Sequence, residues 1–422
     1  MMRLFLNCLA ASAGGGLTYI RNVLPHLASR PEVQVTVTVG SGLRQEFCGL
    51  PNIEIVELQV PLARRFWYEQ SALPRLIQQC QAEVLISAGN FAVRNSPVPQ
   101  ILLSRNSIYT SPDFYRDLRS RHEYRAWFDT RLRSVAAKRS IHWADVTVAP
   151  SMAFAAELKR WTGIPVTTIH HGFDREAFTR NADPLPAAIT EKLRSADGSF
   201  KLLLVSHYNY YRNFETLIRA LPLLRAGVAG RCIKLLVTCQ FVSGSSPKAY
   251  RPRAVAEIVN KLGVSDMMVE LGTIPYHQLH QVYASADLYV TPAYAETFAH
   301  PLVEAMASGV PVVASDIAVH REICGDAAVY FPCFSADALA TAVLQVAHSP
   351  ETRRRMRAAG LERSAQFSWN THVQQILELC ARLIASGGAN SRRTARPIRF
   401  PAQIGNLSES GEPGDRIQAN ER

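Results

Sequence analysis

Short apolar runs alternate with amphipathic segments along the first part of the chain. The runs predict strands, which are expected at Arg3–Ala10, Val33–Val39, Ile53–Leu58, Val84–Ser87, Ile101–Leu103, Ala144–Ala149 and Pro165–Ile169. Leu17–Leu27 has helical spacing, Gly14–Gly16 before it predicts a tight turn, and Ser151 is placed to cap a helix running through Leu158. The first run also resembles a short secretion signal, but Asn7 interrupts it, so we expect a strand there.

The second half of the chain repeats this alternation. Strands are expected at Lys201–Val205, Ile233–Thr238, Met268–Leu271, Leu288–Thr291 and Pro311–Ala314. Helices are expected at Phe214–Leu224, Ala254–Leu262, His277–Ser285, Pro301–Ser308, Ala336–His348, Pro350–Gly360 and Trp369–Ile384. Strands that alternate with helices form parallel sheets joined by helical crossovers. The pattern therefore predicts an α/β protein with two doubly wound, Rossmann-like domains.

A polar stretch with two prolines separates the halves and predicts an interdomain linker at residues 181–199. We therefore expect a first domain over residues 1–180 and a second over residues 200–368. Residues 386–422 are rich in Gly, Ser, Asn, Pro and Arg and hold few large apolar side chains. Such a segment buries too little surface to offset its ordering entropy, so we expect a disordered tail.

Composition narrows the class of protein. Of the 422 residues, 47% are hydrophobic and 19% charged, which is enough apolar mass for more than one buried core. No run approaches the roughly 18–20 uninterrupted apolar residues that a membrane-spanning helix needs. The 8 cysteines are scattered without a Cys-x-x-Cys pair, which favours reduced thiols over a disulfide framework or a zinc site. We expect a cytoplasmic protein.

The chain carries a formal net charge of +11, and basic residues are concentrated between Tyr115 and Ser140. Tyr124, Trp127 and Phe128 lie among them. The stretch fits a solvated helix face, an anionic membrane surface or a contact with a phosphate-bearing acceptor. Nucleic acid is the least favoured partner, and we expect none. Peripheral attachment at the inner face of a membrane stays open.

The segment from Thr291 to Ser315 carries the most specific chemical signal. A strand ends at Thr291, a loop contains Glu296, and Pro301 lies in the first turn of a helix. Open α/β sheets bind ligands at the carboxyl ends of their strands, and free N–H groups at a helix start favour phosphate. Glu296 and Glu304 flank this turn and are suited to accept hydrogen bonds from a ribose and a hexose. Alternatively, Glu304 only favours the helix dipole and Glu296 is solvated.

The segment 296–311 resembles the motif of the retaining glycosyltransferases of family 4; its sequence is Glu-Thr-Phe-Ala-His-Pro-Leu-Val-Glu-Ala-Met-Ala-Ser-Gly-Val-Pro. The resemblance extends along nearly the whole folded chain. It implies a GT-B fold, in which two Rossmann-like domains face a cleft and a C-terminal helix, here 369–385, packs back on the first. It also implies that Glu304 holds the ribose of a nucleotide sugar and that Glu296 lies beside the donor sugar and phosphates. Arg212 stands where the family has a basic residue that neutralises the departing diphosphate.

The same resemblance supplies the other donor-side candidates, which are His207, Ile274, Thr297, Phe298, Ala299 and His300. His207 replaces a second basic residue, which would weaken phosphate neutralisation or make it pH-dependent. His300 could donate to a phosphate or sugar or pack at the helix start. Ile274 lies in a segment that resembles the family's backbone contact with the base. His170 and His171 resemble the turn that enters the linker, and a structural role is favoured for both.

On the acceptor side, Gly15 and Gly16 resemble a glycine-rich loop that faces the cleft and lets the backbone approach the substrate. They form no dinucleotide fingerprint, because Tyr19 stands where a third small residue is needed. Arg105 and Asn106 stand where many relatives carry a histidine that faces the transferred sugar. Asn106 is the candidate retained here, with Arg105 as its alternative.

The expected activity is transfer of a sugar from a nucleoside diphosphate sugar to a glycan, a lipid-linked sugar or a small molecule, with retention of anomeric configuration. Retention is carried over from the family. No cofactor or metal is expected, since the chain has no Asp-x-Asp motif and Arg212 with a helix N-terminus would stabilise the leaving diphosphate. Two alternatives stay open: a non-catalytic sugar-nucleotide-binding protein and a sugar-nucleotide epimerase of the same fold.

Overall fold

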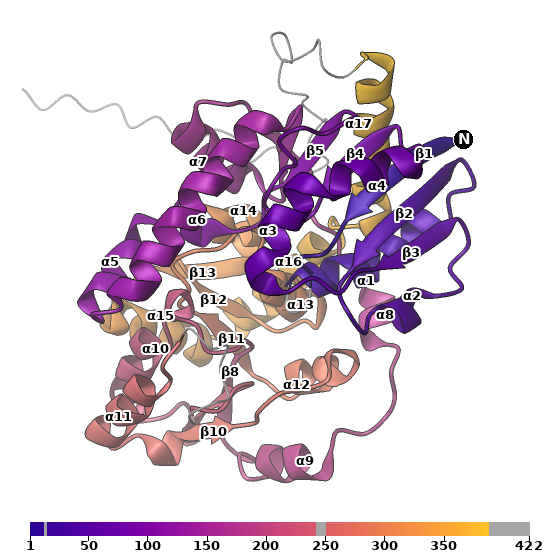
Figure 1. Cartoon of the computed structure of the whole chain (residues 1–422). Helices are drawn as coiled ribbons and strands as arrows, with labels where there is room; N and C mark the ends of the chain where they lie inside the picture. The colour runs from indigo at the N-terminus through magenta and orange to yellow at the C-terminus, as the bar shows by residue number, and fades with distance from the viewer. Residues whose placement is uncertain (12–14, 242–249, 388–422) are drawn as a thin grey trace, which may run out of the picture.

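The computed structural model describes residues 1–11, 15–241 and 250–387, and it divides them between two lobes (Figure 1). Each lobe is built on one parallel sheet. In spatial order, the first sheet consists of β3 (Ile53–Glu57), β2 (Val33–Val39), β1 (Met2–Asn7), β4 (Val84–Ser87), β5 (Gln100–Leu103), β6 (Val146–Ala149) and β7 (Thr167–Thr168). The second consists of β10 (Met268–Glu270), β9 (Ile233–Val237), β8 (Phe200–Leu204), β11 (Leu288–Thr291), β12 (Val312–Ser315) and β13 (Ala328–Phe331).

Helices connect the strands. Those of the first half are α1 (Gly15–Ala28), α2 (Arg44–Phe47), α3 (Leu62–Ser71), α4 (Leu73–Gln79), α5 (Pro112–Ser120), α6 (Tyr124–Trp143), α7 (Met152–Thr162), α8 (Arg175–Thr179) and α9 (Ala187–Arg194). Those of the second half are α10 (Phe214–Ala220), α11 (Arg253–Leu262), α12 (Leu279–Ala284), α13 (His300–Ala307), α14 (Ala318–Cys324), α15 (Ala336–His348), α16 (Pro350–Ser364) and α17 (Trp369–Ala385). Short 3-10 turns η1 (Ser107–Tyr109) and η2 (Tyr210–Arg212) follow β5 and β8. Among the described residues, no helix combines the length and apolar character needed to cross a bilayer.

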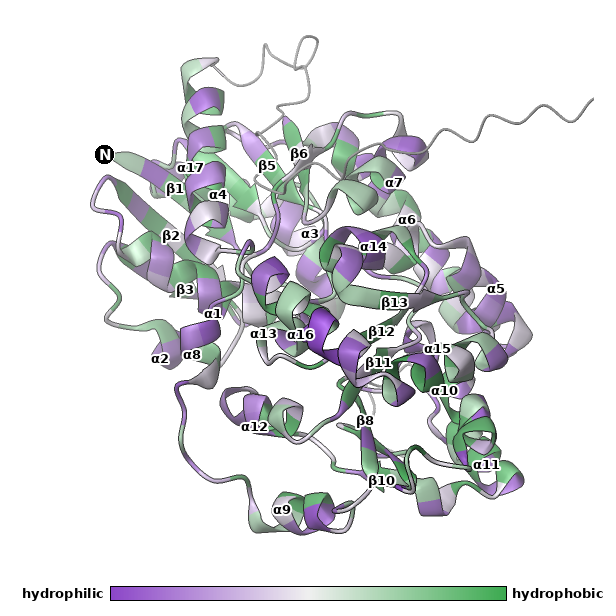
Figure 2. Ribbon diagram, turned by 180° about the vertical axis from the view of Figure 1, so that it is seen from behind, coloured by the Kyte–Doolittle hydropathy of each residue, from purple (hydrophilic) through white to green (hydrophobic). Residues whose placement is uncertain are grey.

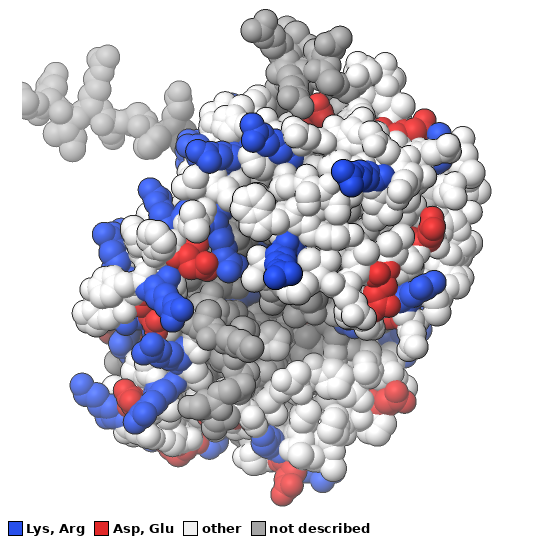
Figure 3. All heavy atoms as spheres, in the orientation of Figure 1, with Lys and Arg blue, Asp and Glu red and all other residues white. Residues whose placement is uncertain are grey.

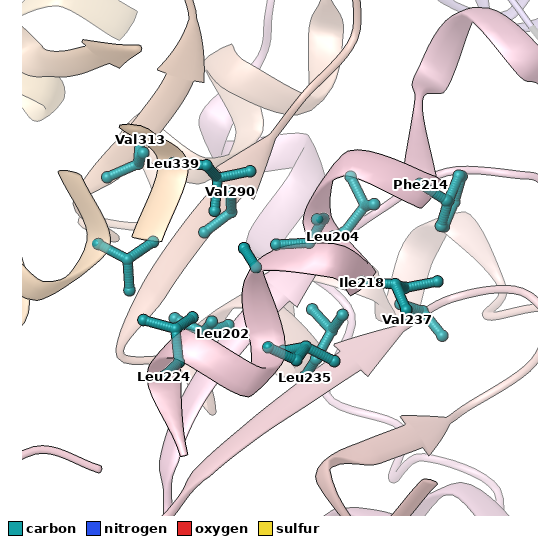
Figure 4. Packing of buried hydrophobic residues seen from close by; sticks show 14 of the residues in the cluster. Leu202, Leu204, Phe214, Ile218, Leu224, Leu235, Val237, Val290, Val313 and Leu339 are labelled. Atoms are coloured by element: carbon teal, nitrogen blue, oxygen red, sulfur yellow. The ribbon is translucent and has the colours of Figure 1, made fainter. Parts of the chain in front are cut away.

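The second lobe shows how strand alternation builds a core on both faces of a sheet. One face buries Leu202, Leu204, Leu235, Val237, Val290 and Val313 against Phe214, Ile218, Leu224 and Leu339 (Figure 4). The opposite face buries Leu203 and Val312 against Leu302 and Met306 of α13. The strands of this sheet are largely hydrophobic, and the helices around them carry both hydrophobic and hydrophilic residues (Figure 2). This two-sided burial confirms the doubly wound α/β architecture expected from the alternation.

Strand order reverses beside the first strand of each sheet, and this reversal positions the site. In the first sheet β1 lies between β2 and β4, and in the second β8 lies between β9 and β11. The two crossovers leaving such a point run to opposite faces, so a crevice opens outside the carboxyl ends of the central strands. The loops after β1, β4, β8 and β11 are therefore where a ligand is expected.

The last helix returns to the first lobe. In α17, yellow in Figure 1, Trp369, Val373 and Cys380 are buried in the same cluster as Leu4 of β1 and Ile20 of α1. The chain crosses between lobes where Gly172 lies against the start of α17. A Cβ at Gly172 would come within 2.0 Å of the backbone nitrogen of Trp369, so only glycine permits this approach.

Local departures from the predictions have simple causes. Gly15 and Gly16 belong to the first turn of α1 rather than to a tight turn, because their backbone is helical; Gly14 lies outside the described residues. The predicted linker contains α9, which is attached to the second lobe by two residues. Ile189 is buried, and Nζ of Lys192 donates to the carbonyl oxygen of Glu270 at 2.7 Å. The expected disorder of the tail concerns residues that, from 388 onward, also lie outside the described part.

Glu322 of α14 ties the second lobe to the first. Its carboxylate accepts the backbone N–H groups of Met152 and Ala153 at the start of α7, each at 2.7 Å, and lies 2.7 Å from Nε2 of His170. The side chain is largely buried. A carboxylate at a helix N-terminus satisfies donors that have no partner within the helix.

Glu322→Ala is expected to lower the free energy of unfolding by about 2–3 kcal/mol, because it removes a largely buried, charged acceptor from two backbone N–H groups and from His170. Urea denaturation followed by circular dichroism measures this change. Glu257→Ala, which breaks an exposed pair with Arg253, is the matched control and should change it by less than about 0.5 kcal/mol. Equal effects for the two variants would contradict the assigned role.

Candidate functional site

A cleft of about 570 Å³ lies between the lobes at the two strand-order reversals. Its walls come from the segments that follow β1, β4, β5 and β7 in the first lobe and β8, β9, β10 and β11 in the second. Every candidate named from the sequence lines it: Gly15, Gly16, Asn106, His207, Arg212, Ile274, Glu296, Thr297, Phe298, Ala299, His300 and Glu304. The fold thus brings together residues from both halves of the chain.

The start of α13 faces this cleft. Ala299, the residue before the helix, has a left-handed backbone (φ +63°), and among the described residues no side chain caps the helix. Pro301 occupies the first turn, where its missing N–H costs nothing. The helix start therefore presents backbone N–H groups and a positive dipole end to the cleft, which favours an anion.

Glu304 is a buried carboxylic acid on the cleft wall. It is 4% exposed, and its Oε2 lies 2.9 Å from the hydroxyl of Tyr283, which donates to it. Burial raises the pKa of Glu304 to about 7, while the hydroxyls of Tyr283 and Tyr276 lower it. The residue lies beyond the first turn of α13, where the dipole effect has faded. A dipole-stabilising role alone does not account for this placement.

Arg212 and Glu296 form an ion pair across the cleft wall, through Nη1 and Oε1. Their side chains are 18% and 10% exposed, so Glu296 is not a solvated loop residue. Nε of Arg212 is buried and without a hydrogen-bond partner. Sequence reasoning placed both residues at the donor but did not foresee that they bind each other, since 84 positions separate them.

Histidines and aromatic rings fill the floor between the lobes. His300 stacks on His171 with ring centroids 5.1 Å apart and on Trp369 at 6.0 Å. Burial lowers the pKa of His300 to about 4, and the nearby Arg105 and His372 lower it further. His300 is therefore neutral at pH 7. The two neighbouring histidines have different surroundings. His170 binds Glu322, whereas His171 lines the cleft. The sequence favoured a structural role for both.

The acceptor-side candidates also separate. Oδ1 of Asn106 accepts the N–H of Ile108 at 3.3 Å and caps the turn η1. The guanidinium of Arg105 lies over the ring of Tyr19, with its carbon 4.4 Å from the ring centroid. Both residues line the cleft, but only Arg105 of the two carries a charge. His207 is exposed at the cleft margin.

Among the described residues, no group of three or more His, Cys, Asp or Glu side chains is arranged so that it could hold a metal ion. Sequence reasoning missed Tyr283 and the stacking partner Trp369, and it favoured a structural role for His171. No local motif marks these residues, because their roles come from contacts between elements that are distant along the chain.

Two family models match the chain. Residues 13–177 match "Glycosyltransferase Family 4", and residues 187–363 match "Glycosyl transferases group 1". Among curated proteins, a D-inositol 3-phosphate glycosyltransferase of Nocardia farcinica is 29% identical over 58% of this chain and 54% of its own length. The O-antigen chain mannosyltransferase B of Escherichia coli is 36% identical over 25% of this chain and 28% of its own. The match thus spans about half of the first relative and less of the second.

Solved structures share the fold along the described chain. A sucrose-phosphate synthase from Thermosynechococcus elongatus has a TM-score of 0.69 at 20% identity, covering 92% of this chain and all of that one. Anabaena Alr3699/HepE in complex with UDP-glucose has a TM-score of 0.68 at 18% identity, covering 91% and 100%. These likenesses concern the fold. Since each half of the chain matches its own glycosyltransferase model and the two together span most of the sequence, the protein belongs to the group 1 glycosyltransferases of family 4.

Proposed function

We propose that the protein transfers a sugar from a nucleoside diphosphate sugar to an acceptor hydroxyl, with retention of anomeric configuration and without a metal ion. One observation carries this proposal: a buried carboxylate, an arginine and an uncapped helix start converge on one wall of the cleft. Support for the donor class comes from the Anabaena neighbour, whose structure was solved with UDP-glucose. Support for sugar transfer comes from both matched families.

Each group has a role that follows from its chemistry. The amides at the start of α13 and the guanidinium of Arg212 bind the diphosphate, and Glu304 accepts the ribose hydroxyls. Glu296 releases part of its contact with Arg212 when the diphosphate arrives and then accepts a hydroxyl of the donor sugar. Positive charge from Arg212 and the helix substitutes for a metal ion as the leaving group gains charge.

The chemical step needs no covalent intermediate on the protein. The bond from C1 of the sugar to the diphosphate oxygen breaks, and the acceptor oxygen forms a bond to C1 on the same face. Its proton passes to the departing diphosphate oxygen, which acts as the base. The first lobe, with Gly15 and Gly16 at the cleft, holds the acceptor.

A panel of nucleoside diphosphate sugars tests the donor class. A ligand that binds only the folded state adds about 2.7 kcal/mol to the free energy of unfolding when its concentration is 100 times Kd. This added stability raises the melting temperature. We expect at least one nucleotide sugar to stabilise the protein and to release free nucleoside diphosphate when acceptor is added. Stabilisation without release would favour a silent binding protein, and absence of stabilisation across the panel would refute the donor site.

We further propose that α6 docks on an anionic membrane, so that the acceptor is lipid-linked. Tyr124, Phe128, Leu132 and Val135 are exposed apolar residues at helical spacing, with Phe128 66% and Leu132 63% exposed. Lys and Arg side chains gather on the side of the molecule that carries α5 and α6 (Figure 3). An apolar stripe beside cations is the pattern that binds the interface of an anionic bilayer.

Replacing Phe128 and Leu132 with serine is expected to weaken binding to phosphatidylglycerol vesicles about tenfold or more, since two large side chains no longer leave water. Co-sedimentation with the vesicles measures this, and added salt should weaken wild-type binding too. Leu223→Ser removes an equally apolar, 48% exposed side chain from the second lobe and should change nothing. Failure of the wild-type protein to sediment with these vesicles would refute the membrane proposal.

A further inference from the structure

Arg105 is a partly buried cation without an anionic partner. Among its three side-chain nitrogens, Nη2 donates to the carbonyl oxygen of Ala88, while Nε and Nη1 are buried and lack any hydrogen-bond partner. No carboxylate in the described part of the chain pairs with it. A buried charge with unpaired donors is costly, so such an arginine is expected to face a partner that completes it.

Two other partly buried arginines, Arg121 and Arg212, each pair with a carboxylate. Arg121 pairs with Asp117 and Glu215, both at 2.7 Å, and Arg212 pairs with Glu296. In both cases a carboxylate of the protein neutralises the guanidinium. Arg105 is left with its charge directed at the cleft that it lines.

The position of Arg105 is fixed by a chain of hydrogen bonds beneath it. Its guanidinium lies over Tyr19, whose hydroxyl is 3.0 Å from Nε2 of His372. Nδ1 of His372 lies 2.8 Å from the carbonyl oxygen of His170, which can only accept. Nδ1 is therefore the donor, and Nε2 accepts the proton of Tyr19. This arrangement holds the ring under the guanidinium in one orientation.

Around Arg105, the histidines are neutral. Burial lowers the pKa of His372 and of His300 to about 4, and the charge of Arg105 contributes to both shifts. Burial likewise lowers the pKa of His171 far below its ordinary value. At pH 7 the positive charge of this wall is thus carried by Arg105. Nδ1 of His171 and Nε2 of His300 are also buried and unpartnered, which leaves further polar atoms unsatisfied beside it.

We propose that Arg105 binds a carboxylate or phosphate group of the sugar substrate at the first-lobe wall of the cleft, so that the enzyme selects an acidic ligand. The proposal rests on the proposed function and specifies its substrate class. The acidic group has two sources, the transferred sugar of the donor or the acceptor. The free N–H groups at Nε and Nη1 can donate charge-assisted hydrogen bonds to either group.

Isothermal titration calorimetry with matched ligands separates the two sources. The donor arm compares UDP-glucose with UDP-glucuronate and GDP-mannose with GDP-mannuronate. The acceptor arm compares glucose, glucuronate and glucose 6-phosphate on protein saturated with UDP or GDP. We expect the acidic member to bind about 10- to 100-fold more tightly in one arm, the worth of one or two hydrogen bonds to a charged group.

Variants assign that preference to Arg105. Arg105→Gln should abolish it, Arg105→Lys should keep part of it, and Arg253→Gln, which removes a cation 83% exposed on α11, should keep all of it. Affinity for UDP or GDP, bound by the second lobe, should stay within about twofold in every variant and shows that each is folded. A preference that survives Arg105→Gln, or no preference in either arm, overturns the proposal.

Failure of the proposed function is distinguishable from failure of this inference. Binding of UDP or GDP without preference for an acidic sugar leaves the donor site intact and refutes the role of Arg105. If neither nucleotide binds, glucuronate and inorganic phosphate titrated alone decide the matter. Binding of either that is lost in Arg105→Gln then supports the anion site, and no binding refutes it.

Discussion

Arg212→Ala is expected to lower kcat/KM for donor turnover about 10³-fold, the usual cost of removing one charge that stabilises a leaving group. The guanidinium lies at the carboxyl end of β8, at the strand-order reversal, with one nitrogen buried and unpartnered. As the sugar leaves, the diphosphate gains charge that this arginine neutralises. Steady-state release of nucleoside diphosphate measures the loss.

The same substitution leaves Glu296 without its partner, so the ion pair needs its own control. Arg212→Ala combined with Glu296→Gln removes both charges and should stay as slow as Arg212→Ala, because the missing cation limits the rate. Arg225→Ala breaks an exposed ion pair with Asp266 and should leave kcat/KM unchanged. Recovery of wild-type rates in the double variant would show that Arg212 only compensates Glu296.

Glu304→Gln is expected to weaken donor binding about 10- to 100-fold and, at the same time, to stabilise the protein above pH 7. The carboxylate accepts ribose hydroxyls, and an amide of the same shape keeps one weaker acceptor. Donor titrations by calorimetry measure the loss of affinity. Because burial raises the pKa of Glu304 to about 7, wild-type affinity should also fall below pH 7, as the carboxylate takes up a proton.

The sign of the stability effect follows from the same pKa. Folding raises it from 4.5 to about 7, so the folded protein holds this proton more tightly than the unfolded chain. The contribution to stability is complete below pH 4.5 and is lost as pH rises to 7. At pH 8, the free energy of unfolding of Glu304→Gln should therefore exceed that of the wild type by about 3 kcal/mol. A less stable variant at pH 8 would contradict a buried carboxylate in this position.

The sequence was sufficient to predict the first sheet, most of the second sheet and the loop that carries the site. Parallel strands buried on both faces read as continuous apolar runs, and this is why β8 and β11 were found almost to the residue. The spacing of Glu296 and Glu304 lies within one strand–loop–helix unit, so local sequence fixed it. The edge strand β13 and the helix α9 were missed, since each is short and its burial depends on neighbours.

Contacts between distant elements could not be predicted in the same way. The pair Arg212–Glu296 joins two loops, and the hydrogen bond from Tyr283 to Glu304 joins α12 to α13. The choice between Arg105 and Asn106 depended on which side chain the turn η1 uses as its cap. These contacts depend on how the elements pack, which the residue types alone do not reveal.

A crystal structure of the protein with a bound nucleoside diphosphate tests the central claim most directly. The account predicts phosphate oxygens within hydrogen-bond distance of Arg212 and of the first amides of α13, with a ribose hydroxyl on Glu304. A nucleotide bound elsewhere, or one in this cleft that leaves both Arg212 and Glu304 without contact, would contradict it.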